Sequence, residues 1–171
     1  SRHKHTGYDA KGLLQSLVPS FPLEDETLND KYWARNYVVL TAPQYRLVIL
    51  NTSAYHGAAE GEFEHGRIAP RTIQSLRTEL EVLEKDSPRQ INILLCHHHP
   101  HDLGDVEEND PSLMKGGTKL LELLGSGDFG NWIVVHGHKH HPRIGYAAAT
   151  IAPPIIFSAG SLSAKLYEAL Q

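Results

Sequence analysis

The sequence predicts an α/β fold in which a mixed β-sheet is flanked by helices. Short apolar runs of strand length alternate, between Tyr37 and Ser158, with segments whose apolar residues recur every three or four positions. Two of these runs, residues 91–96 and 132–135, are apolar almost throughout, as strands buried on both faces are. Both are followed by histidines. The alternation of strands and helices indicates a layered α/β domain with a largely buried sheet.

Bulk composition indicates one globular domain over residues 1–171. The chain is 40% hydrophobic and 21% charged, and its net charge of -4 gives no basic footprint for nucleic acid. It has no apolar run of 18 residues and no charged-then-apolar leader, so we expect no membrane association. The single cysteine, Cys96, excludes an internal disulfide framework and favours a reducing compartment, with the cytoplasm as the expected location.

The N-terminal part is expected to hold one helix and a hairpin. Asp9 is a candidate cap for a short helix through Val18. Residues 20–30 are acidic and contain proline, and we interpret them as a loop. Residues 37–41 and 45–50 are β-branched and aromatic runs joined through Ala42-Pro43-Gln44, which predicts a hairpin with proline in its turn.

Two longer helices are expected next. Pro70 begins one of them, with a single apolar stripe of Ile73, Leu76, Leu80 and Leu83 that ends before Ser87-Pro88. Residues 111–124 form the other, although Gly116-Gly117 weakens its middle. The strands that follow the hairpin are predicted at residues 91–96, 132–135, 143–151 and 155–158.

Histidines gather after two of the strands. Eight of the twelve fall in these two places, at His97, His98, His99, His101, His136, His138, His140 and His141. Neutral imidazole is the commonest protein ligand of transition metals. Because ligands usually bind at the carboxyl ends of the strands of such sheets, this clustering predicts a metal site there.

Other polar residues are expected to have ordinary roles. His56 and His65 lie in a glycine-rich loop and are expected at the surface. The acidic run of Asp102, Asp105, Glu107 and Glu108 is expected to be a solvated loop rather than a ligand set. Cys96 is expected to act as a small hydrophobic residue of its strand.

The succession of a hydrophobic strand, His98-His99-Pro100, a helix, a second hydrophobic strand and Gly137-His138-Lys139-His140 resembles the C-terminal half of the calcineurin-like metallophosphoesterases. Gly66-Arg67-Ile68-Ala69-Pro70 and the closing segment 157–163 are also similar to that family, so the resemblance covers about residues 37–163. It implies half of a four-layer α/β/β/α sandwich.

The resemblance also implies a metal site. His98 matches the lone imidazole ligand of one metal, and His138 and His140 match the pair that divides between two metals. In an extended loop, residues two apart point the same way, so both imidazoles are expected to reach a shared site. His97 or His99 is expected to donate a hydrogen bond to a ligand rather than to bind metal. Two transition metals (Mn, Fe, Zn or Co) would carry a bridging hydroxide that attacks a phosphate ester.

The chain departs from the family in its first half. The Asp-x-His, Gly-Asp and Gly-Asn-His motifs, which supply the bridging carboxylate and the proton-donating histidine, are absent from the expected order. The resemblance implies a metal-activated water as the nucleophile, and no residue of this sequence matches the family's proton donor. We expect this chain to be a C-terminal portion that is inactive or nearly inactive alone. We also expect it to expose one apolar sheet face and therefore to associate with the missing half, to self-associate or to be poorly soluble.

Three functional hypotheses follow. The first is a metal-dependent phosphatase or phosphodiesterase, with this chain supplying part of a dinuclear site. The second is a non-catalytic metal-binding or regulatory module on the same scaffold. The third is a mononuclear zinc hydrolase that uses three histidines and water.

Overall fold

The structure, a computed structural model, describes residues 10–57, 62, 65–86, 91–101, 112–138, 140, 142–147 and 150–160. Its centre is a six-stranded sheet with the order β1-β2-β3-β4-β6-β5. The strands are β1 (Tyr37–Thr41), β2 (Tyr45–Leu50), β3 (Ile91–Leu95), β4 (Trp132–His136), β5 (Arg143–Tyr146) and β6 (Ile155–Ser158). The helices are α1 (Ala10–Gln15), α2 (Glu26–Arg35), α3 (Pro70–Asp86) and α4 (Gly117–Leu124). The prediction of a mixed sheet with flanking helices is confirmed.

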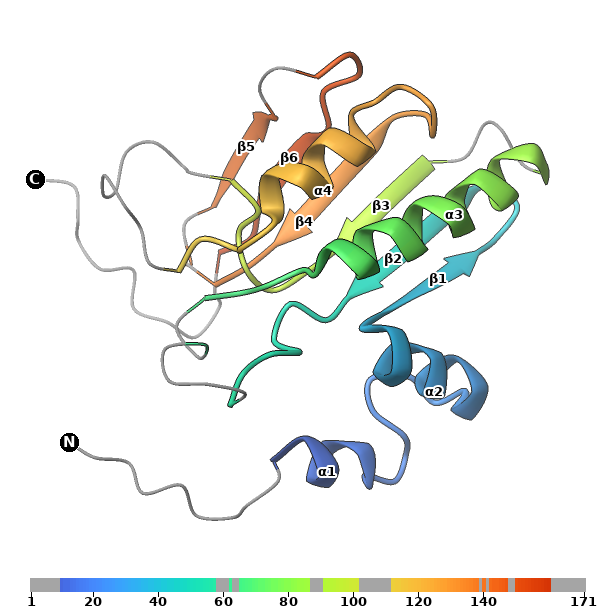
Figure 1. Cartoon of the computed structure of the whole chain (residues 1–171), viewed down its shortest axis with the longest axis vertical. Coiled ribbons are helices and arrows are strands. Elements are labelled where there is room, and N and C mark those ends of the chain that lie inside the picture. Colours follow the sequence, from blue (N-terminus) through green and yellow to red (C-terminus); the bar gives the residue numbers. More distant parts are fainter. Residues whose placement is uncertain are drawn as a thin grey trace, which may run out of the picture.

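The four inner strands run parallel and the two edge strands antiparallel. β2, β3, β4 and β6 pair in parallel, whereas β1 pairs with β2 and β5 with β6 in antiparallel register. The predicted hairpin of β1 and β2 is confirmed. Figure 1 shows α3 and α4 side by side over one face of the sheet, with the arrowheads of β2, β3 and β4 pointing to the same edge. The histidines follow β3 and β4 at that edge.

The hydrophobic core lies between the sheet and the two long helices. Leu76 and Leu80 of α3 are fully buried, as the three-and-four spacing predicts. They share one cluster with Leu120 and Leu124 of α4 and with the sheet side chains Val48, Leu94, Val134 and Ile156. These four sheet residues are consecutive partners across β2, β3, β4 and β6, so one cross-strand row forms the floor of the core.

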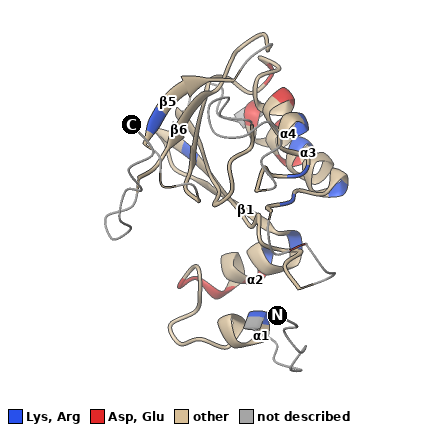
Figure 2. Cartoon of the chain, turned by 90° about the vertical axis from the view of Figure 1, so that its left-hand side faces the viewer, with Lys and Arg blue, Asp and Glu red and all other residues tan. Residues whose placement is uncertain are grey.

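The opposite face of the sheet is also apolar. Because side chains alternate along a strand, the register places two further cross-strand rows there. The rows are Val38, Ile49, Leu95, Val135, Phe157, Ile144 and Leu40, Leu47, Ile93, Ile133, Ile155, Tyr146. Ile144 and Tyr146, at the β5 edge, are 72% and 70% exposed, whereas Val38 of β1 is buried, and α3 and α4 lie over the other face of the sheet. Figure 2 shows acidic and basic positions on α3 and α4 and around α2, and few along the strands, where a basic position lies on β5.

The prediction of a loop over residues 20–30 is wrong for its last five residues, because α2 begins at Glu26. Asp25 caps this helix: its side chain accepts a hydrogen bond from the Leu28 amide at 2.9 Å. Asn36 ends it in the left-handed region at φ 63°. The acidic, proline-containing stretch suggested a loop, but one of its acids is the capping residue.

Three other boundaries differ from the prediction. α1 ends at Gln15, before the predicted Val18, and its expected cap, Asp9, lies outside the described residues. The second long helix begins only at Gly117, because Gly116 stands at φ +84° before it. β5 ends at Tyr146, well before residue 151. In the part of the chain that is described, no helix is long and apolar enough to span a bilayer.

Candidate metal centre

Three imidazoles meet where β3 and β4 end. His97, His98 and His138 each offer a ring nitrogen, and these nitrogens all lie within 4.8 Å of one another. His97 and His98 follow β3, and His138 follows β4, its parallel neighbour. The two segments are joined by a hydrogen bond of 3.1 Å from the Gly137 amide to the His97 carbonyl. The parallel pairing of two strands therefore creates the group.

His98 is the most firmly held of the three. Its side chain is buried, and its Nδ1 lies 2.8 Å from the Thr52 hydroxyl, so Nε2 is the nitrogen left for a metal. Gly66 packs against its ring: a Cβ there would lie 2.4 Å from Cγ of His98. Burial and the neighbouring imidazoles, His138 foremost, lower the pKa of His98 to about 3. His98 is thus in the neutral form that binds metals.

His97 and His138 face each other across the group. His138 Nδ1 and His97 Nε2 are 3.1 Å apart, a distance at which two neutral rings share one proton. Two nitrogens bonded to one tetrahedral zinc at ~2.0–2.1 Å lie about 3.3 Å apart. The spacing of these two nitrogens is therefore close to that in a zinc site. Ring centroids of 4.7 Å for both the His97–His98 and the His98–His138 pairs keep the third imidazole close.

The structure brings His98 and His138 together as predicted but puts His97 where His140 was expected. His138 and His140 have φ values of 75° and 59°, so the loop is not the extended segment that would align residues two apart. His140 is exposed and lies outside the group of three. The pKa of His97 is lowered mainly by burial, then by the charge of His56 and, least, by that of His140. The chain bends at His97 and His98, which lets both turn toward His138.

Two more histidines lie on the helix-covered side of the sheet. His99 and His136 are each 1% exposed, and their ring centroids are 6.2 Å apart. His136 Nδ1 donates to the Gly137 carbonyl at 3.1 Å, which fixes its tautomer. Burial, more than the charges of His99 and His101, lowers the pKa of His136. His99 also lies near His138, with 6.0 Å between ring centroids. His99 and His136 are therefore buried neighbours of the group of three imidazoles and do not belong to it.

Sequence reasoning missed His56 and His65. The prediction that both lie at the surface is wrong: His65 is 8% exposed, and His56 is half-buried. The His56 ring meets that of His98 edge-on at 5.3 Å, and His56 Nε2 lies 3.2 Å from the His65 carbonyl. For His65 the available signal was its place directly before Gly66, in the segment that shares the family resemblance, whereas His56 lies ten residues before Gly66 and carried no such signal.

The remaining predicted residues contribute less. Cys96 packs against the hydrophobic core, as predicted, and burial raises the pKa of its thiol to about 12. The acidic run of Asp102, Asp105, Glu107 and Glu108 lies outside the described residues, as does His141. Among the described residues, no carboxylate belongs to the group of three imidazoles.

Neither a scan of known protein-family models nor a search of curated proteins finds a match for this chain.

Proposed function

We propose that this chain supplies part of the metal site of a hydrolase that cleaves phosphate esters. The observation that carries the proposal is the convergence of His97, His98 and His138 within 4.8 Å at the carboxyl ends of two parallel strands. Such a strand edge is where ligands bind in open α/β sheets. Imidazole ligands suit zinc and iron, which are two of the metals that the family resemblance implies.

The residues of the chain prepare a metal for that chemistry. Thr52 and the close approach of Gly66 hold His98 in one orientation, and His97 and His138 converge from two strand ends. A bound divalent metal would supply Lewis acidity, which lowers the pKa of a water nucleophile and stabilises charge on phosphorus. No described side chain takes the place of a general acid at this group.

We further propose that a second segment completes the site. The family resemblance implies carboxylate ligands and a second metal. In this chain, His140 is the residue that the resemblance offers to that second metal. The apolar rows on the face opposite α3 and α4, exposed most at Ile144 and Tyr146, support such a partner, because an apolar sheet face packs against a second sheet in layered folds. The resemblance points to the N-terminal half of the same domain as that partner. The single cysteine is compatible with assembly in the cytoplasm.

Metal analysis and turnover assays test this function. The chain, purified without added metal and then loaded with zinc or manganese, should retain about one ion per molecule. With the complementary segment added, it should hydrolyse an aryl phosphate or an aryl phosphodiester, and it should do so poorly alone. Failure to retain metal after desalting would refute the proposal. So would full activity in a preparation whose His98 is replaced by alanine.

A second candidate is a non-catalytic metal-binding module. It is favoured by the composition of the group, which among described residues consists of imidazoles alone. Such a module would retain metal stoichiometrically but stay inactive with every partner supplied. Zinc retention together with ester hydrolysis by the isolated chain would instead favour a mononuclear zinc hydrolase.

A further inference from the structure

A carboxylate and two cations form a compact charged group beside the histidines. Arg67 Nη1 and Lys115 Nζ contact the same oxygen of Glu62, Oε1, at 3.4 and 3.3 Å. His65 Nε2 lies 3.5 Å from the other oxygen, Oε2. Two cations that converge on one carboxylate oxygen are placed as they would be for an oxygen of phosphate.

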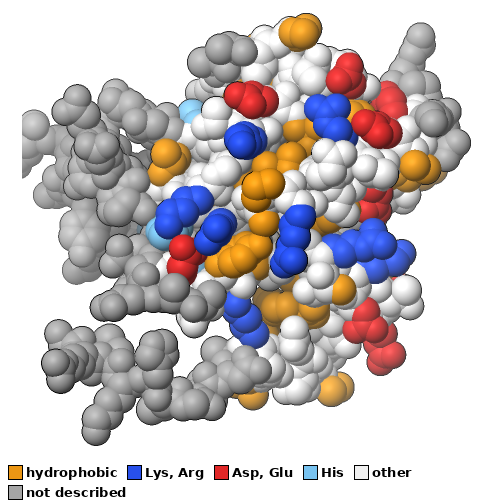
Figure 3. All heavy atoms as spheres, in the orientation of Figure 1, with side chains coloured by type: hydrophobic (Ala, Val, Ile, Leu, Met, Phe, Trp, Pro, Cys, Tyr) orange, Lys and Arg blue, Asp and Glu red, His pale blue; other side chains and the backbone are white. Residues whose placement is uncertain are grey.

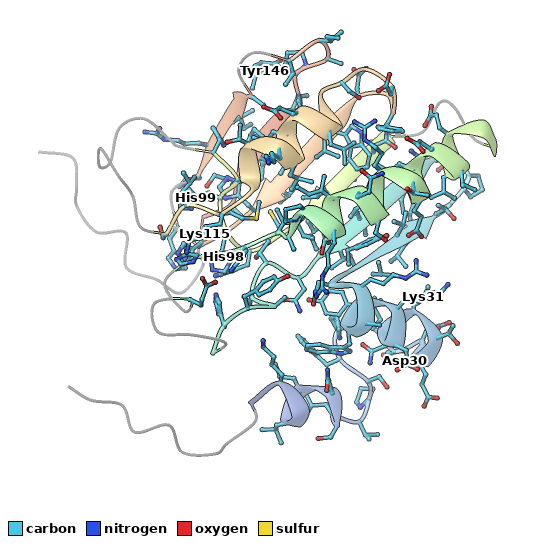
Figure 4. All side chains as sticks on the ribbon, viewed as in Figure 1. Asp30, Lys31, His98, His99, Lys115 and Tyr146 are labelled. Atoms are coloured by element: carbon cyan, nitrogen blue, oxygen red, sulfur yellow. The ribbon has the colours of Figure 1, made fainter. Side chains whose placement is uncertain are left out.

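Backbone contacts fix this group next to the metal centre. Arg67 follows Gly66, which touches the His98 ring, and the Arg67 amide donates to the Thr52 carbonyl at 2.9 Å. The Lys115 amide donates to the Gly66 carbonyl at 2.8 Å, and Arg67 and Lys115 form a parallel β-bridge. Figure 4 shows Lys115 beside His98 and His99 at the margin of the sheet.

The side chains of Arg67, Lys115 and Glu62 differ in their exposure to solvent. The side chains of Arg67 and Lys115 are 41% and 55% exposed, whereas that of Glu62 is 13% exposed beneath them. The Arg67 guanidinium also lies over the Tyr55 ring, 4.7 Å from its centroid, which limits its rotation. In Figure 3 histidine, basic and acidic side chains gather at this margin of the surface. Both cations thus face solvent with their backbones held in place.

We infer that Arg67 and Lys115 form an anion subsite that receives the phosphate group of the substrate, and that Glu62 holds the place of that group in the free protein. The inference rests on the proposed function for the identity of the substrate. Displacement of Glu62 would leave two uncompensated positive charges beside neutral imidazoles. The two negative charges of a phosphomonoester dianion neutralise the two positive charges of Arg67 and Lys115. A phosphodiester has one negative charge, the same as the Glu62 carboxylate that it would displace, and so gains no charge advantage over it. The subsite therefore favours monoesters.

The exchange is energetically accessible. Ion pairs whose members are partly exposed contribute little to stability, so loss of the Glu62 contacts is offset by the new contacts to phosphate. Charge-assisted hydrogen bonds from arginine and lysine to phosphate are among the stronger ones in proteins.

Binding of inorganic phosphate to the metal-free chain tests the subsite separately from catalysis. Binding is followed by NMR in the presence of a chelator, at fixed ionic strength and at a pH where phosphate is mainly a dianion. Dimethyl phosphate serves as the monoanionic probe. Lys115→Met and Arg67→Met should each weaken phosphate binding about tenfold, and Glu62→Gln should strengthen it about as much. Lys119→Met, which removes an exposed charge of α4, should change nothing.

The outcomes are distinct. Unchanged or weaker phosphate binding by Glu62→Gln overturns the inference, because this variant keeps both cations and loses only the competing charge. Equal affinities for phosphate and dimethyl phosphate overturn the preference for monoesters. If these tests succeed while the chain retains no metal, the anion subsite stands and the proposed hydrolase fails. If metal-dependent hydrolysis is found but Glu62→Gln does not change phosphate binding, the proposed hydrolase stands and the anion subsite fails.

Discussion

The hydroxyl of Thr52 lies 2.8 Å from Nδ1 of His98, and this contact joins the end of β2 to the end of β3. Both groups are buried, so neither can exchange its partner for bulk water. The contact determines which nitrogen of His98 faces the other two imidazoles. Loss of a polar side chain that orients a ligand in this way typically lowers metal affinity about 10–100-fold.

Replacement of Thr52 by valine should weaken metal binding. Valine keeps the shape of threonine but lacks the hydroxyl, so the His98 ring loses the hydrogen bond that fixes its orientation. We expect zinc affinity to fall about 10–100-fold, measured by competition with a chromogenic chelator. Thr52→Ser retains the hydroxyl and should bind zinc nearly as tightly as the unchanged chain. Equal affinities for the valine and serine variants would show that the contact has no such role.

Gly66 should tolerate no side chain. A Cβ at this position would lie 2.4–2.6 Å from three atoms of His98, so Gly66→Ala must displace the ring or the backbone. We expect lower zinc affinity in a chain that still folds, as judged by circular dichroism. Gly145→Ala is the matched control, because a Cβ there meets nothing within 4 Å. A Gly66→Ala chain that binds zinc normally would contradict the close packing.

Cys96 should react slowly with thiol reagents, and its ionisation should lower the stability of the folded chain at alkaline pH. Burial raises its pKa from 9.0 to about 12, so the thiol stays protonated in the folded chain after it would ionise in the unfolded one. Its contribution to stability is complete below pH 9 and is lost as the pH rises toward 12. Urea unfolding of the unchanged chain and of Cys96→Ala across this range should show a shallower pH dependence for the variant. Fast alkylation of the folded chain near pH 8 would contradict the burial.

Charges placed on the open face of the sheet should reduce association. Ile144 and Tyr146 lie in the two apolar rows and are largely exposed. We expect the chain to self-associate through these rows in the absence of a partner, and Ile144→Lys with Tyr146→Lys to shift sedimentation toward the monomer. Val18→Lys changes an apolar residue that is 96% exposed but lies outside the sheet, and it should have no such effect. An unchanged sedimentation profile for the double variant would mean that association, if present, uses another surface.

The sequence predicted the fold well where periodicity carried the information. The apolar stripe of α3 and the β-branched runs of β1 and β2 gave correct elements, because burial of one face dictates those patterns. α2 was missed because its signal is a single capping residue, Asp25, within an acidic segment. Local capping chemistry is hard to recognise in a sequence when no strong apolar stripe follows it.

The grouping of the imidazoles was predicted in part. The motifs identified His98 and His138, since both follow buried strands that were recognisable from their apolar runs. The choice between His97 and His140 depends on backbone angles after the strands, and a sequence pattern does not specify a φ of 75° at His138. His56, His65 and Glu62 reach the site only through tertiary contacts of a loop, for which no periodic signal exists.

X-ray absorption spectroscopy of the zinc-loaded chain tests the central claim most directly. It should show imidazole nitrogens at ~2.0–2.1 Å from a zinc ion that elemental analysis gives as about one per chain. Alanine replacement of His97, His98 or His138 should each lower zinc affinity at least about tenfold, while His140→Ala should leave it unchanged. Loss of zinc in the His140 variant combined with normal binding in the His97 variant would contradict the site described here, as would a zinc spectrum without imidazole ligands.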